Sequence, residues 1–97
     1  MRRGRCCRPR PFVMRDTLRS PRQIVLRTEL RALRERHRLT QEELARRLGK
    51  PQSFVSKYEG GERRLSVIEF IDVVRAIGEE PVSALRKVIP AIDRAGT

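Results

Sequence analysis

Two four-residue patterns set where helices begin in the centre of this chain, and a glycine ends each of those helices. TQEE at Thr40–Glu43 and SVIE at Ser66–Glu69 both place a hydroxyl three residues before a glutamate. In this capping box, the two side chains and the two backbone amides exchange hydrogen bonds. Gly49 and Gly78 then supply the left-handed conformation that commonly terminates a helix. The centre of the chain is therefore restricted to short helices.

Hydrophobic spacing and proline positions predict the remaining helices. Leucines recur on one face of a helix that begins at Arg22. Pro51 and Pro81 suit the first turns of two further helices, and Pro90 is expected to bend or end the last one. In the helix after Ser66, five apolar residues are expected to face inward: Val67, Phe70, Ile71, Val74 and Ile77.

These elements predict an all-α fold of five helices over residues 22–90, with one core. The capped helix is expected to span about residues 41–48, and the helix after Pro51 about residues 52–58. Residues 1–21, which are rich in arginine and proline, are expected to form a disordered basic tail. Residues 91–97 are expected to fray.

The charge of the chain favours a polyanionic partner, with nucleic acid first and an acidic membrane surface second. The net charge is +11 over 97 residues, although residues 1–20 hold seven arginines against one aspartate. No metal site is expected, because there is one histidine and no CxxC pattern, and no cofactor is expected. Without a membrane-length apolar run or a nucleophile–base set, we expect a cytoplasmic protein that is not an enzyme.

Two short helices joined by a turn around Gly49 have the sequence form of a helix-turn-helix. The stretch LTQEELARRLGKPQSFVSKYEGGERRLSVIEFIDVVRAIG resembles the Cro/CI-type, or lambda-repressor-like, helix-turn-helix family, also called XRE. The resemblance covers about Leu26 to Leu85. It implies a five-helix lambda-repressor-like fold, DNA binding and transcriptional regulation, commonly as a homodimer.

The resemblance also assigns roles to individual residues. Base contacts in the major groove fall to the exposed side of the second helix of the motif, at Gln52, Ser53, Ser56 and Lys57. Lys57 could take either guanine or a phosphate. Phosphate contacts fall to the start of the first helix and the turn after the second, at Thr40, Gln41, Arg63 and Arg64. Glu59 matches a position that pairs with an arginine of the first helix of the domain, here Arg34.

Some alternatives stay open from the sequence. Phe54 either touches a thymine methyl group or covers Tyr58 one helical turn away. The basic tail is either a DNA-binding arm or an extension without function. Gly60 and Glu62 stand where the family often has Asn and Lys, so two phosphate contacts are in doubt.

The leading prediction is a sequence-specific, repressor-like DNA-binding regulator that dimerises through Val82, Leu85, Val88 and Ile89. The alternative is an antitoxin or accessory module with an autoregulatory helix-turn-helix, whose operon would supply a protein partner.

Overall fold

The computed structural model describes residues 20–95 and folds them into five helices, with no strand in that range. The helices are α1 (Pro21–Arg36), α2 (Gln41–Leu48), α3 (Gln52–Glu59), α4 (Val67–Ile77) and α5 (Pro81–Ala95). The predicted all-α fold is therefore confirmed. The predictions for the basic tail, apart from its last two residues, lie outside the described residues, as do those for residues 96–97.

Both predicted capping boxes are present, and they place α2 and α4 at their expected starts. The Thr40 hydroxyl accepts from the Glu43 amide at 3.0 Å, and the Glu43 carboxylate accepts from the Thr40 amide at 2.9 Å. Ser66 and Glu69 repeat this exchange at 3.1 and 2.8 Å. Local hydrogen bonds are therefore sufficient to set where α2 and α4 begin.

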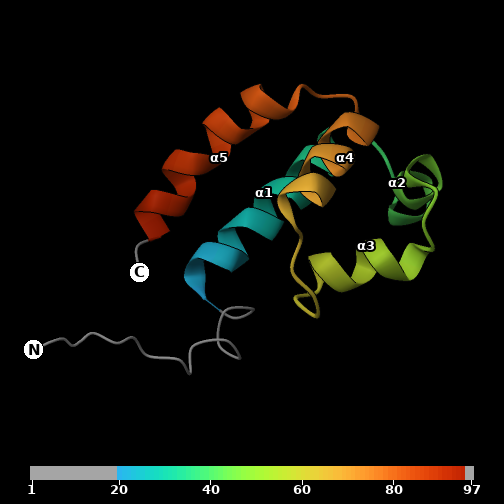
Figure 1. Ribbon diagram of the computed structural model, residues 1–97, viewed down its shortest axis with the longest axis horizontal. Helices are drawn as coiled ribbons and strands as arrows, with labels where there is room; N and C mark the ends of the chain where they lie inside the picture. The colour runs from blue at the N-terminus through green and yellow to red at the C-terminus, as the bar shows by residue number, and fades with distance from the viewer. Residues whose placement is uncertain (1–19, 96–97) are drawn as a thin grey trace, which may run out of the picture.

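The helices enclose one core, to which all five contribute. Helices α1 and α5 lie side by side, and α3 lies apart from α5 in Figure 1. Helices α2 and α3 pack on each other, and Val55 and Tyr58 of α3 are almost fully buried. The buried apolar side chains are Leu30, Leu33, Leu39, Leu44, Ala45, Val55, Tyr58, Phe70, Val73, Val74, Ile77, Ala84 and Val88.

One expectation about an inward-facing residue and one about an outward-facing residue were wrong. Val67 is 76% exposed, because it is the first residue of α4 and lies beyond the edge of the core. Val73, which was not expected inside, is fully buried instead. Val88 was expected on a dimer surface but is buried against the core together with Ala84, so it is not accessible to a partner.

Helix α5 does not end at Pro90 and continues to Ala95. Proline removes one backbone donor from a helix, but the turns on either side retain their own hydrogen bonds. The last turns also have partners, because Ile92 is half-buried and Asp93 lies 3.8 Å from Arg22 at the start of α1. Packing along α1 is therefore the physical reason that the expected fraying at residues 91–95 is absent.

The left-handed backbone at Gly49, in the turn between α2 and α3, can be tested directly by substitution. Gly49 has φ 69°, and a Cβ placed there would meet no atom within 4 Å. Gly49→Ala should therefore lower the free energy of unfolding by about 1 kcal/mol through backbone strain alone. Chemical denaturation would measure this loss. Gly49→Asn should lose less, because asparagine tolerates the left-handed region better. Equal stability of the alanine variant and the wild type would contradict this explanation.

Candidate nucleic-acid interface

One side of α3 is buried and the other carries the four residues predicted to read bases. Val55 and Tyr58 are 0% and 1% exposed. Gln52, Ser53, Ser56 and Lys57 are all exposed. The structure thus brings the four together on one solvent-facing surface, although contact with DNA stays a prediction.

An ion pair ties the end of α3 to α1. The Glu59 carboxylate accepts from Arg34 Nε at 2.8 Å and from Arg34 Nη2 at 3.1 Å, which is a two-point contact between the planar groups. The two side chains are only 2% and 8% exposed. This is the pair that the family resemblance implied, and its burial makes Glu59 a structural residue rather than one that faces phosphates.

The rest of the Arg34 guanidinium is also paired, which makes its burial tolerable. Arg34 Nη1 donates to the Leu39 carbonyl at 2.6 Å, in the segment between α1 and α2. The hydrogen bond to Glu59 raises the pKa of Arg34, and burial opposes that rise. The guanidinium therefore stays charged at all relevant pH values and fixes the position of three segments.

Gln41 lies at the first turn of α2 and is part of the same network. Its amide nitrogen donates to Glu59 at 2.9 Å, a contact that the sequence did not predict. The side-chain amide of glutamine has two N–H donors, so a second remains for another acceptor. Thr40 is exposed at the preceding position, and its hydroxyl caps α2. These two of the four predicted phosphate-binding residues therefore lie at the positive end of the α2 dipole.

The two arginines beyond α3 differ in their surroundings. Arg64 is exposed, whereas Arg63 is half-buried and donates to the Glu69 carboxylate at 3.0 Å. The hydrogen bond from the Ser66 amide, followed by the interaction with Arg63, lowers the pKa of Glu69. Sequence reasoning missed the attachment of Arg63 to Glu69, because no local pattern links the loop to the first turn of α4.

Phe54 packs inward from the other edge of α3. Its ring meets the Tyr58 ring edge-on, with the centroids 5.7 Å apart, and it borders the core. Of the two alternatives left by the sequence, the cover over Tyr58 is therefore present. Burial raises the pKa of Tyr58, so its hydroxyl is neutral in the folded protein.

Residues 20–95 hold no group of three or more His, Cys, Asp or Glu that would suit a metal ion. Within the same range, no helix is both long enough and apolar enough to cross a membrane.

Two short helices that cross closely, the second with a polar exposed face, define a helix-turn-helix protein. The helix-turn-helix family matches residues 30–83 of the chain. A solved relative, an XRE-family like protein from Pseudomonas syringae pv. tomato str. DC3000, superimposes with a TM-score of 0.71. It is 46% identical, and the match covers 80% of this chain and 95% of that one. The chain therefore belongs to the XRE-type helix-turn-helix family, as its sequence predicted.

A curated relative, the uncharacterised HTH-type transcriptional regulator y4dL of Sinorhizobium fredii (strain NBRC 101917 / NGR234), is 41% identical over 64 residues. The match covers 66% of this chain, which spans about a third of that relative's length (33%). These similarities place the described domain in a class of DNA-binding regulators rather than of enzymes.

The Arg34–Glu59 pair gives a prediction that separates stability from base reading. Glu59→Ala leaves a buried guanidinium without its carboxylate and should lower the free energy of unfolding by about 3 kcal/mol. Thermal and chemical denaturation would measure the loss. Glu42→Ala is the control, because Glu42 is exposed in the same helix-turn-helix and should change stability by less than about 0.5 kcal/mol. An unchanged melting temperature for Glu59→Ala would refute the structural role.

Proposed function

We propose that this protein is a transcription regulator that binds double-stranded DNA and reads its major groove with α3. One observation carries the proposal: the four polar residues of α3 share its exposed side, while its apolar side is locked into the core. A helix held in this way presents the same side chains at every encounter. That constancy is what base reading requires.

The residues of α3 suit specific base edges. Gln52 is the first residue of the helix, and a glutamine amide can pair with adenine N6 and N7 at once. Lys57 suits the two acceptors of guanine, and the Ser53 and Ser56 hydroxyls can either donate or accept. Together they supply the three or four base contacts that one such helix makes.

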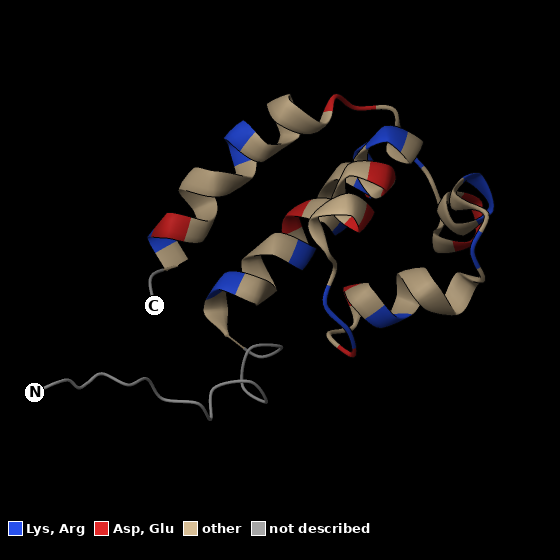
Figure 2. Cartoon of the chain, in the orientation of Figure 1, with Lys and Arg blue, Asp and Glu red and all other residues tan. Residues whose placement is uncertain are grey.

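Phosphate contacts would position the domain on the duplex. Gln41 and Thr40 lie at the start of α2, where backbone amides and the helix dipole favour an anion. Arg63 and Arg64 follow α3 on the other side. Figure 2 shows basic residues in the segments at both ends of α3, so cations flank the reading helix. We infer a cytoplasmic location from the DNA partner.

Selection of bound sequences from random DNA would test the reading role. Gln52→Ala should erase the preference at one base position, at a cost of about 1–3 kcal/mol on the preferred sequence, and retain binding to other DNA. Arg64→Gln is the matched control, because Arg64 is exposed and loss of a phosphate contact should weaken binding to all sequences about equally. A selected motif that is identical for Gln52→Ala and the wild type would exclude Gln52 as a reading residue.

We further propose that two copies pair through α5, since one helix reads too few bases to discriminate well. Val82, Leu85 and Ile89 lie on one side of α5 and are 55%, 42% and 45% exposed. A different side of α5 faces the core, where Ala84 and Val88 are buried. A two-fold pair would bind two half-sites about one DNA turn apart, and the operator would be a pseudo-palindrome.

Leu85→Lys should break this pair, because a charge in the middle of the apolar stripe would be buried without a partner. Analytical ultracentrifugation would show a monomer, and binding to a two-half-site duplex would weaken while binding to one half-site persists. Ser83→Lys is the control, since Ser83 is exposed on the same helix outside the stripe. If Leu85→Lys and the wild type sediment alike, this interface is wrong.

A further inference from the structure

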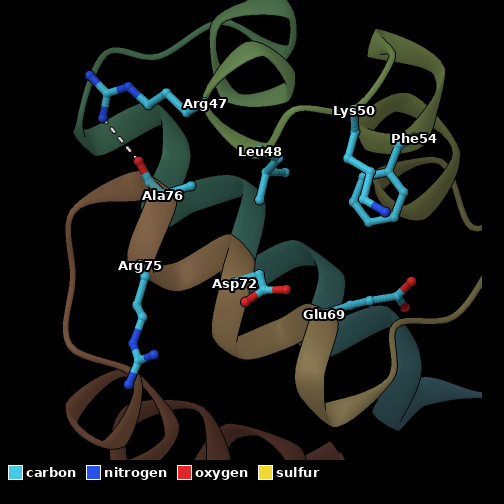
Figure 3. Close-up of a pocket in the computed structure, with 8 residues that line it drawn as sticks. All are labelled: Arg47, Leu48, Lys50, Phe54, Glu69, Asp72, Arg75 and Ala76. Atoms are coloured by element: carbon cyan, nitrogen blue, oxygen red, sulfur yellow. Dashed lines mark hydrogen bonds between the residues drawn. The ribbon is translucent and has the colours of Figure 1, made fainter.

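Two cations lie over the ring of Phe54, one from the segment before α3 and one from the segment after it. Lys50 belongs to the segment between α2 and α3, and its Nζ lies 5.4 Å from the centroid of the Phe54 ring. Arg63 belongs to the segment between α3 and α4, and its Cζ lies 4.7 Å from the same centroid. Figure 3 shows the Lys50 side chain alongside the ring. Both distances are within the range in which an aromatic face attracts a cation.

The ring is a fixed support, because the core holds it. Phe54 packs edge-on against Tyr58 with an interplanar angle of 68°, and Tyr58 is 1% exposed. Phe54 is itself half-buried, so one part of the ring faces the protein and another part meets solvent. Cations that lie on this ring are therefore held in place relative to α3.

Arg63 has a second attachment that keeps its guanidinium near the ring. One terminal nitrogen donates to Glu69, whose carboxylate also accepts from the Ser66 amide at 2.8 Å in the α4 capping box. Only one of the five N–H donors of a guanidinium is needed for that bond. The remaining donors can take a phosphate oxygen while the attachment persists.

The cleft beside Phe54 has a volume of about 390 Å³ and mixes both signs of charge. Glu69 and Asp72 lie in it, together with Lys50, Arg47 and Arg75 (Figure 3). Arg47 is hydrogen-bonded to α4, because its guanidinium donates to the Ala76 carbonyl at 2.9 Å. Three cations and two carboxylates line the cleft, so its net charge is small and the cavity itself does not favour an anion.

We propose that Lys50 is a further phosphate-binding residue and that Phe54 is the positioning residue that holds Lys50 and Arg63 beside the reading face of α3. The proposal rests on the proposed function, since it assumes that α3 enters the major groove. A free lysine or arginine side chain loses rotamer freedom when it grips a phosphate. Side chains already held on an aromatic ring lose less, so Phe54 raises affinity for every DNA sequence without itself touching the DNA.

Salt-dependent binding to two duplexes of equal length, one with the selected sequence and one random, tests both residues. Lys50→Gln should weaken binding to both duplexes and reduce the slope of log affinity against log salt by about 0.9, the value for one phosphate contact. Arg36→Gln is the matched control. Arg36 is exposed in the last turn of α1, beside α5, and its removal should leave the slope unchanged.

Phe54→Leu should weaken binding to both duplexes by about five- to tenfold, because two side chains that are no longer held on the ring then lose rotamer freedom on binding. The salt slope should remain that of the wild type, because Lys50 and Arg63 still reach phosphates in the complex. Phe54→Tyr keeps the ring and should restore affinity. The combined Lys50→Gln and Phe54→Leu variant should lose less than the product of the two single losses, because both changes remove the same contact.

A Lys50→Gln slope equal to that of Arg36→Gln would overturn the phosphate role. A loss in Phe54→Leu that falls on the selected duplex and spares the random one would overturn the positioning role and indicate a direct base contact. Wild-type protein that binds neither duplex would instead refute the proposed function, so the two failures are distinguishable. Melting temperatures are measured for each variant. If Phe54→Leu is unfolded, Phe54→Tyr and Lys50→Gln still decide the outcome.

Discussion

The contact between Arg34 and Glu59 is the constraint on which the rest of the interface depends. Two hydrogen bonds join the end of α3 to the last turn of α1. Both side chains are almost completely removed from water. Two buried charges are favourable only when each polar atom is paired, and here the Leu39 carbonyl and the Gln41 amide complete the set. The start of α2 and the end of α3 are thus held by the same carboxylate.

A consequence follows for the two kinds of DNA contact that we propose. Gln41 would bind phosphate and Gln52 would read a base, and neither can shift far without disturbing the network around Glu59. The register of the domain on the backbone and the depth of α3 in the groove would therefore be set together. Phosphate contacts that fix register carry no sequence information themselves, so their rigid connection to α3 is what makes base reading meaningful.

The sequence predicted the helix boundaries well where local chemistry decides them. The capping boxes at Thr40 and Ser66 and the glycines at 49 and 78 act within a few residues, so a pattern in the sequence is sufficient. Predictions failed where packing decides. Val67 and Val88 have the same apolar character, yet Val67 is exposed as the first residue of α4, whereas Val88 is buried where α5 packs on α1. Neither outcome is encoded in a short window of sequence.

The candidate site shows the same division. The polar side of α3 could be read from helical periodicity, and the Arg34–Glu59 pair from family resemblance. The attachments of Gln41 to Glu59 and of Arg63 to Glu69 and Phe54 could not, because they join residues whose proximity depends on the tertiary fold. Contact between the four α3 residues and bases stays a prediction.

Helix α5 packs on α1 and α4, whereas α3 packs on α2 and α1. The small core-facing residues Ala84 and Val88 hold α5 in place, and its outward stripe takes no part in that packing. Substitutions in the stripe therefore need not disturb the polar side of α3, and substitutions at Gln52 need not disturb the stripe. Related genes that arise by duplication could diverge in either property alone. Under the base reading and the pairing that we propose, a copy could acquire a new operator before it loses the ability to pair with its parent, or cease to pair while both still compete for one operator.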